Sequence, residues 1–548
     1  MKKILLILLF LIPCILQAQH LLVHPTHAVY DFITELANQQ LLDITTVTKP
    51  YGHNQVAKWL GEVDISRLNQ RQLQELEFYN KEFFFRGPVS KLSGDTGGPE
   101  IKNGFLRARP NDRLDLYQYF DSLFTITVNP IGGGDLYINE NGSAWHWWNG
   151  AEASATIGKW SLYGSLRDNH QSEWLTDPDN LNRNYGGANF KNTGEGATDY
   201  WEYRGGASYD FGIGNIGIYK DHFVWGNNYN GANIFSGRTH SFAHVALNIS
   251  PVKWLEFHYV HGWLVSEMID SSASFVYTNG YGSGFRPLYH PKFMAANMFT
   301  LKPVRGLNLS AGNSIIYDYD TPHLAYFIPF MFYKPVDHHL SSGINNMNSN
   351  MFFDISIRLI PKTHLYTTLF IDELAVKRIW DPDDYNFVSS KSGIRFENII
   401  PNTYAGFEYT ITNALTFQHF VPTTTFESNR DNLGHYLEDN AKEIYAYLGF
   451  RPARAMKISL SYSNAMKGPD HTILGTQPRM RIAPFSPVVW ERDRFSFQFS
   501  FQVFNGAYFR LGFTSDYTRG EDFYLERYTP EFRRGRVNEF NFGMNYGF

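Results

Sequence analysis

The sequence predicts a mainly β fold: a large antiparallel β-barrel that spans a membrane and carries a small amino-terminal three-helix unit. Three observations predict it: an alternating aromatic strand over residues 539–548, an export signal at the amino terminus, and a regular exchange of short turns with long loops from about residue 105 onward. At about 10 residues per spanning strand plus loops, the remaining length predicts roughly 16 to 18 strands.

The last ten residues alternate without a break between large apolar and small or polar side chains. A period of two is the period of a strand, so one face is aromatic and the other polar. Lipid outside and water inside a barrel suit these two faces, although an ordinary amphipathic edge strand has the same pattern. The apolar face is made by Phe540, Phe542, Met544, Tyr546 and the terminal Phe548.

The amino terminus has the pattern of a signal peptide, predicted over residues 1–18. Lys2 and Lys3 precede an apolar run that ends at Ile15, and Ala18 offers a cleavage site. The run is too short to span a bilayer as a helix. Cys14 is the only cysteine, so the exported chain is expected to have neither a disulfide nor thiol chemistry.

Residues 19–90 are predicted to form a helical unit in the periplasm. Apolar residues recur at helical spacing over residues 28–39, a turn is expected at Thr48-Lys49-Pro50-Tyr51, and a short helix follows around Trp59. Asn69 can cap a third helix that runs toward Phe84. A unit this small needs packing against something larger, so we expect it to dock on the barrel. A Gly-rich linker is expected over residues 91–104.

Residues 105–548 are predicted to form the barrel. Proline turns are expected at residues 250–253, 302–305, 360–363 and 451–454, and long loops near residues 168–198, 225–239, 270–291, 425–440 and 468–487. Short turns that alternate with long loops match the periplasmic and extracellular ends of an outer-membrane barrel. The clearest strands are expected at residues 122–129, 159–167, 201–209, 253–261, 352–359, 364–370, 443–450, 457–463 and 494–503.

Composition narrows the function. The net charge of −5 argues against a nucleic-acid partner, which needs a basic patch. Aromatic residues make up 17% of the chain while the mean hydropathy is only −0.33. Diluting apolar residues with alternate polar ones explains both values for a barrel, although a soluble sugar-binding domain also fits them.

Enzyme signatures are missing from the sequence: there is no nucleophile elbow, zinc helix, phosphate loop or dinucleotide motif. Asp337-His338-His339 is the most catalytic-looking cluster, and we interpret it as a polar loop or strand end. The carboxylates of residues 381–384 suit Ca²⁺ chemically but lack the spacing of a calcium loop. We therefore expect a non-enzymatic protein with no metal and no cofactor.

Aromatic and amide residues in the predicted loops suggest a ligand. Flat rings stack on the apolar faces of sugars, and amides pair with hydroxyl groups. The alternative is the aromatic girdle at the membrane interfaces, which also uses Trp and Tyr. The candidate polysaccharide-binding residues are Trp145, Trp147, Trp148, Trp174, Trp225, Asn227, Asn228 and Tyr229.

Several short motifs resemble the Wzi-type capsule assembly family of outer-membrane barrels. They include Val29-Tyr30-Asp31-Phe32, the Thr48–Tyr51 turn, Val128-Asn129-Pro130, Trp225-Gly226, Leu324–Pro329 with Phe332-Tyr333, and Ile371-Asp372-Glu373. The resemblance implies a large barrel with a helical bundle near its periplasmic mouth. It also implies a role in holding surface polysaccharide to the outer membrane.

The first hypothesis is an outer-membrane barrel that binds surface polysaccharide and helps to export or retain it. The second is a component of gliding motility or secretion machinery that acts through protein partners, since long loops could hold a protein as well as a glycan. The third is a passive pore for small solutes. All three place the exported chain in outer-membrane lipid.

Overall fold

A computed structural model describes residues 21–83, 103–109, 113–121, 123–172, 175, 179–183, 191–192, 197–280, 282–340, 347–379, 386–471 and 485–547. The predicted signal peptide, most of the predicted linker and residues 381–384 lie outside these ranges. The predicted boundaries between signal peptide, helical unit, linker and barrel therefore stay predictions.

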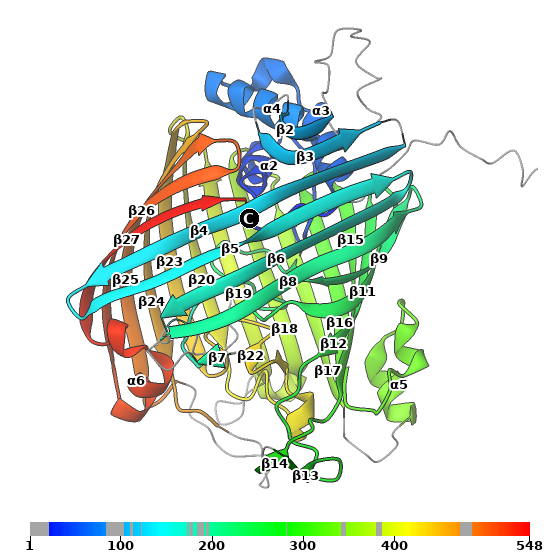
Figure 1. Cartoon of the computed structure of the whole chain (residues 1–548), viewed down its shortest axis with the longest axis vertical. Helices are drawn as coiled ribbons and strands as arrows, with labels where there is room; N and C mark the ends of the chain where they lie inside the picture. Colours follow the sequence, from blue (N-terminus) through cyan, green and yellow to red (C-terminus); the bar gives the residue numbers. More distant parts are fainter. Residues whose placement is uncertain are drawn as a thin grey trace, which may run out of the picture.

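The described residues form a closed antiparallel barrel of 18 strands, in agreement with the predicted fold class and the upper end of the predicted strand number (Figure 1). Each strand pairs with its neighbours along the chain, and β27 pairs with β4 to close the barrel. In chain order the strands are β4 (Phe124–Asn139), β5 (Gly142–Ile157), β6 (Trp160–Ser172), β8 (Ala197–Asp210), β9 (Gly214–Asp221), β11 (Phe242–Val252), β12 (Leu255–Leu264), β15 (Lys292–Val304), β16 (Leu307–Tyr317), β17 (Asn348–Ile357), β18 (Thr363–Glu373), β19 (Phe387–Glu397), β20 (Thr403–Thr412), β23 (Ala441–Ala453), β24 (Met456–Lys467), β25 (Trp490–Phe504), β26 (Ala507–Gly520) and β27 (Arg536–Tyr546).

The two ends of the barrel differ as the sequence predicted. Short connections such as residues 253–254 and 505–506 lie at the end that also holds the carboxy-terminal end of β27, which we call the turn end. Long connections lie at the opposite, loop end, with the exception of the two-residue turn at residues 140–141 between β4 and β5. The loops contain β7 (Lys191–Asn192), β10 (Val224–Trp225), β13 (Phe275–Asn279), β14 (Gly282–Arg286), η5 (Leu324–Phe327), α5 (Tyr333–Leu340), η6 (Val376–Ile379), η7 (Pro422–Thr424), β21 (Glu427–Ser428), β22 (Asp431–Asn432), α6 (Asp522–Tyr528) and η8 (Glu531–Arg533).

Three of the four predicted proline turns are corrected by one or two residues. Pro251, Pro303 and Pro452 lie inside the last residues of β11, β15 and β23, where the pairing register shifts, and each tight turn follows them. Proline lacks an amide hydrogen, so it fits a strand at such an irregular pair. Only Pro361 lies between two strands, β17 and β18.

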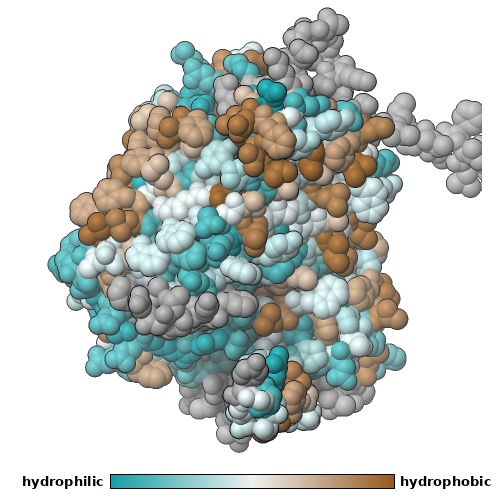
Figure 2. Space-filling view, viewed as in Figure 1, coloured by the Kyte–Doolittle hydropathy of each residue, from teal (hydrophilic) through white to brown (hydrophobic). Residues whose placement is uncertain are grey.

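The barrel wall alternates between an apolar outer face and a polar inner face. On β9, for example, Ile216 and Ile218 are exposed on the outside, whereas Asn215 and Asp221 are buried on the inside. Figure 2 shows apolar side chains spread across one outer face of the molecule. This is the pattern of a barrel that contacts lipid.

The amino-terminal unit has the predicted three helices, α2 (Val29–Asn38), α3 (His53–Gly61) and α4 (Gln70–Phe83), with the short η1 (Ile65–Arg67) between the last two. As predicted, Asn69 caps α4: its side-chain oxygen accepts a hydrogen bond from the Gln72 amide at 2.9 Å. Among the described helices, none is long and apolar enough to cross a membrane. A hairpin of β2 (Gly104–Ala108) and β3 (Leu114–Phe120) then pairs with the turn-end half of β4.

The segment between α2 and α3, residues 39–51, enters the barrel and is called the plug segment here. The predicted turn at residues 48–51 is instead β1 (Thr48–Lys49), which pairs with β10. β10 belongs to residues 222–241, a loop-end connection that folds into the lumen and is called the lumen loop. Unpaired main-chain groups of the plug segment thus find partners inside the barrel, which local sequence alone does not predict.

Candidate functional site

The plug segment and the lumen loop are fixed to the wall by buried polar contacts. The Thr45 hydroxyl donates to Glu256 on β12 at 2.6 Å, and Asn308 on β16 donates to the Ile44 carbonyl at 3.2 Å. In the lumen loop, Asn227 donates through its main-chain and side-chain nitrogens to Asp354 on β17 at 2.9 and 2.7 Å. These contacts hold both segments against the inner wall between β12 and β17.

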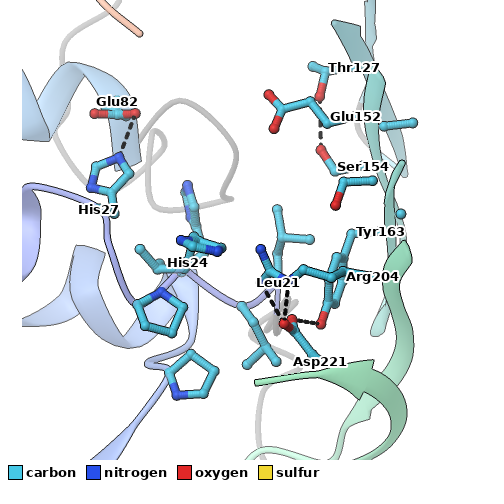
Figure 3. Close-up of a pocket in the computed structure, with 18 of the residues that line it drawn as sticks. Leu21, His24, His27, Glu82, Thr127, Glu152, Ser154, Tyr163, Arg204 and Asp221 are labelled. Carbon is cyan, nitrogen blue, oxygen red and sulfur yellow. Dashed lines mark hydrogen bonds and ion pairs between the residues drawn. The ribbon is translucent and has the colours of Figure 1, made fainter. Parts of the chain in front are cut away.

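On the opposite side, a cavity of about 150 Å³ lies between the residues that precede α2 and the wall formed by β4 to β9 (Figure 3). Leu21 and His24 line it from the amino-terminal side, and Thr127, Ser165 and Arg204 line it from the wall. Since these wall residues lie in the turn-end halves of β4, β6 and β8, the cavity belongs to the turn-end part of the lumen.

Arg204, Asp221 and Tyr163 form the polar centre of the cavity wall. The Arg204 guanidinium donates to the Asp221 carboxylate at 2.6 Å, and the Tyr163 hydroxyl donates to the same carboxylate at 2.5 Å. Figure 3 shows the three side chains converging from neighbouring strands beside Leu21. A carboxylate held by two donors is fixed in place, so it can orient a polar ligand without rearranging.

Further charges surround this centre. Arg113 pairs with Glu152 on the wall, and His27 pairs with Glu82 of α4 at 3.4 Å. Burial alone would raise the pKa of Glu82, but His27 and two nearby arginines outweigh it and lower the pKa to about 2. Burial and the adjacent Arg204 lower the pKa of His24 well below its usual value.

Arginines and carboxylates are equal in number around the cavity. Arg109, Arg113 and Arg204 face Glu82, Glu152 and Asp221 among the described lining residues. A balanced lining does not select an anion or a cation, whereas its many donors and acceptors suit hydroxyl groups. A cavity of this volume holds a ligand of about the size of one six-membered ring.

Polar and aromatic residues continue along the inner wall from the cavity toward the loop end. Strand register places Glu152, Ser165 and Arg204 side by side. Two positions further along, Arg167 lies opposite Glu202, and the next level contains Trp148 and its neighbours on β6 and β8, Asn169 and Tyr200. The wall above the cavity therefore combines rings, amides and charges.

The three clustered tryptophans do not form one site. Trp147 points outward and is 45% exposed, and its ring stacks on His170 at 3.9 Å. Trp145 shares its face of β5, because residues two apart in a strand point the same way. Trp148 points inward and packs against the Arg167 guanidinium at 4.9 Å. Outward rings fit the aromatic girdle, which leaves Trp148 as the lumen residue of this group.

The other predicted ligand residues that the structure describes lie in the lumen loop. Trp225 is only 2% exposed and packs edge-on against Phe235 at 5.2 Å, so it has no open ring face in this conformation. Asn227 is buried against Asp354, and the Asn228 side chain donates to the Gly226 carbonyl at 2.8 Å. Tyr229 bonds to His364 on the wall at 2.9 Å. The structure places these residues in the contacts that fix the lumen loop. Their role in ligand binding stays a prediction.

Trp174 lies outside the described residues, as do residues 381–384. Asp337, His338 and His339 belong to helix α5, which corrects the predicted loop or strand end. Asp337 is buried, while the two histidines are exposed. In the described part of the chain, no group of three or more His, Cys, Asp or Glu residues is arranged to hold a metal ion.

Sequence reasoning missed the residues that line the cavity. Arg204, Asp221 and Tyr163 are single polar residues in three different strands, and no short motif contains them. The one available signal is strand alternation, which places each of them on the inner face once the strands are assigned.

No family model matches the chain, and no curated protein matches its sequence. Among solved structures, Wzi from Escherichia coli, described as an outer membrane protein involved in group 1 capsule assembly and a carbohydrate-binding β-barrel, is 11% identical with a TM-score of 0.58. The match covers 96% of this chain and 99% of Wzi.

Two further matches score lower. OccAB2 from Acinetobacter baumannii is 10% identical over 77% of this chain and 97% of its own, with a TM-score of 0.43. OprD from Pseudomonas aeruginosa is 10% identical over 77% of this chain and 94% of its own, with a TM-score of 0.38. At these identities the similarity concerns the fold: a large barrel of the outer-membrane type.

Proposed function

We propose that this chain is a non-enzymatic barrel of the outer membrane that binds surface polysaccharide and helps to export or retain it. The observation that carries the proposal is that the plug segment enters the lumen and pairs there with the lumen loop through β1 and β10. Chain segments fixed inside a barrel are suited to holding a ligand, whereas a passive pore needs an open path.

The cavity beside Arg204 supports a sugar as the ligand. Its lining has balanced charge and many hydrogen-bonding groups, and its volume suits a single sugar ring. A polysaccharide would insert one sugar unit into the cavity, and its remaining sugar units would contact other surfaces of the barrel. The carbohydrate binding described for Wzi agrees with this proposal. Because the two chains are only 11% identical, the proposal rests on the site in this chain.

Two adjacent residues of β6 provide a matched test in cells. Ser165 lines the cavity, and Leu166 points to the outside and is 44% exposed. Ser165→Trp fills the cavity, and Leu166→Trp adds the same side chain to the lipid-facing surface. Each variant is expressed in a deletion strain, and polysaccharide is measured on the cells and in the medium.

We expect the deletion strain and Ser165→Trp to shed polysaccharide into the medium, and Leu166→Trp to retain it. Spreading on agar is scored in the same strains. Unchanged polysaccharide with a loss of spreading in the deletion strain would contradict the proposal and indicate a protein partner.

A further inference from the structure

One sector of the outer barrel surface is covered. Outward residues elsewhere are exposed, such as Ile218 on β9 at 57% and Ile355 on β17 at 43%. On β12 and β16, between those strands, the outward residues Phe257 and Ile315 are 3% and 0% exposed. The inner residues of the same strands face the lumen, since Glu256 contacts the plug segment. Something therefore lies on the outside of this sector.

The cover is the connection between β16 and β17. Its residues 324–333, called the external strap here, run through η5 and lead into α5. Tyr326 and Tyr333 of the strap are fully buried and form one cluster with the outward residues Tyr259 and Tyr317. Figure 1 shows α5 outside the barrel wall, beside β16 and β17. The connection thus turns back from the loop end along the outer surface.

Polar residues of the wall satisfy the irregular main chain of the strap. Asn297 on β15 donates to the carbonyls of Pro329 and Met331 at 2.8 and 2.7 Å. The Asn313 side chain on β16 accepts a hydrogen bond from the Tyr333 amide at 2.9 Å. The hydroxyl of Tyr259 on β12, which lies opposite Asn297, donates to the Tyr326 carbonyl at 2.8 Å.

These contacts matter for where the strap can lie. Non-helical main chain is tolerated at membrane depth only where protein groups satisfy it, because lipid offers no hydrogen bonds. An amide side chain on the lipid-facing side of a barrel is otherwise costly. Asn297 and Asn313 supply hydrogen bonds to the main chain of the strap, and the strap in turn shields their amide side chains from lipid.

The strap reaches far along the wall. Its Phe330 ring lies 4.6 Å from Phe257. Phe257 is three positions from Trp254 in the turn that joins β11 and β12, about 10 Å along a strand. The apolar band of such barrels is about 25 Å tall. Starting from the loop end, the strap therefore passes the middle of that band.

We propose that the external strap is embedded in the membrane and presents its outer face to lipid acyl chains. That face carries Leu324, Ile328, Phe330 and Phe332, which are between 47% and 82% exposed. It is continuous with exposed outward residues of the wall such as Phe299, which contacts Phe330. The inference rests on the proposed membrane location of the barrel, and its partner is lipid.

Depth-dependent quenching tests this directly. The exported chain is expected to have no cysteine, so single cysteines carry one fluorescent label each. The test position is Phe330→Cys. Ile355→Cys on the outer wall is the control for lipid contact, and Val276→Cys on β13, 74% exposed in a loop-end hairpin, is the control for water. Each refolded protein is placed in phosphatidylcholine vesicles with spin-labelled acyl chains or with iodide in the buffer.

We expect acyl-chain quenching at positions 330 and 355 and iodide quenching at position 276. Iodide quenching at position 330 with acyl-chain quenching at position 355 would show that the barrel is in the membrane but the strap is not, which would overturn the proposal. Protection of 330 from both quenchers would also overturn it, because a protein surface would then cover the strap. Iodide quenching at both 330 and 355 would contradict the membrane location itself. If Phe330→Cys does not refold, Phe332→Cys replaces it.

Discussion

Glu35 links the helical unit to the barrel through a buried ion-pair network. It is 1% exposed, its carboxylate pairs with Arg71 and with Arg451 of β23, and it accepts hydrogen bonds from Gln72 at 2.7 Å and Asn398 at 2.8 Å. Burial alone would raise the pKa of this carboxyl, but Arg451 and Arg71 outweigh it and lower the pKa. Glu35→Gln keeps the shape and removes the charge.

The expected cost is large because both arginines stay buried. Removing one partner of a buried ion pair typically costs 3–5 kcal/mol, and the remaining acidic partners Glu75 and Glu397 favour the lower end, about 3 kcal/mol. At about 1.4 kcal/mol per factor of ten, the undocked population rises roughly 150-fold. Because Arg451 of the barrel helps to lower the pKa of Glu35, the contribution of this ion pair to docking is complete above about pH 4.3 and is lost as the pH falls further.

Labelling of Val47→Cys measures the undocked population. Val47 is 1% exposed in the plug segment, so a maleimide reaches this position only when the segment leaves the lumen. The control is Asp31→Asn, also in α2. Asp31 pairs with Lys457, but the two side chains are 43% and 41% exposed, and such a pair contributes at most about 1 kcal/mol.

We expect labelling to be roughly 150-fold faster in Glu35→Gln and less than about fivefold faster in Asp31→Asn. Equal labelling rates in the two variants would refute the reasoning, because they would mean that the buried network does not hold the unit in place.

Two further predictions concern the barrel wall and a loop. Gly449→Ala places a methyl group against the Tyr404 ring, so its thermal midpoint should fall by an amount that reflects about 1–3 kcal/mol. Gly164→Ala should unfold like the parent, because its methyl group would lie 3.9 Å from the Arg204 carbonyl oxygen, an ordinary contact distance. Equal midpoints would contradict this packing. Burial raises the pKa of Asp431 in β22 to about 7 despite its ion pair with Arg238 at 3.2 Å. The pKa of Asp431 in the folded loop exceeds its value of about 4 in the unfolded chain. The folded loop is therefore most stable below about pH 4, and its stability falls as the pH rises toward 7. Hydrogen-exchange protection of residues 413–440, corrected for intrinsic rates, should fall from pH 5 to pH 8, and Asp431→Asn should reduce that dependence. An unchanged dependence would contradict the assignment to Asp431.

Strand periodicity predicted the barrel because each spanning strand alternates between apolar residues that face outward and polar residues that face the lumen. The clearest predicted strand, residues 494–503, lies within β25, and the amphipathic pattern of α2 was equally direct. The same alternation separates Trp147 from Trp148, and it had to be applied residue by residue to see that they face opposite sides.

Features that depend on contacts between distant segments were not predictable in this way. The pairing of β1 with β10 joins residues about 180 positions apart, and nothing in Thr48-Lys49 indicates it. The external strap was visible only as an apolar motif at residues 324–333, since its position outside the wall depends on Asn297 and Asn313. The cavity is lined by residues of several elements that are distant in the sequence, so no local pattern predicts it.

Direct binding to the purified barrel tests the central claim most sharply. Surface polysaccharide from the source strain is titrated into detergent-solubilised parent protein, Ser165→Trp and Leu166→Trp, and the heat of binding is measured. The account predicts saturable binding by the parent and by Leu166→Trp, and its loss in Ser165→Trp. Equal binding by Ser165→Trp, or no binding by the folded parent protein, would contradict it.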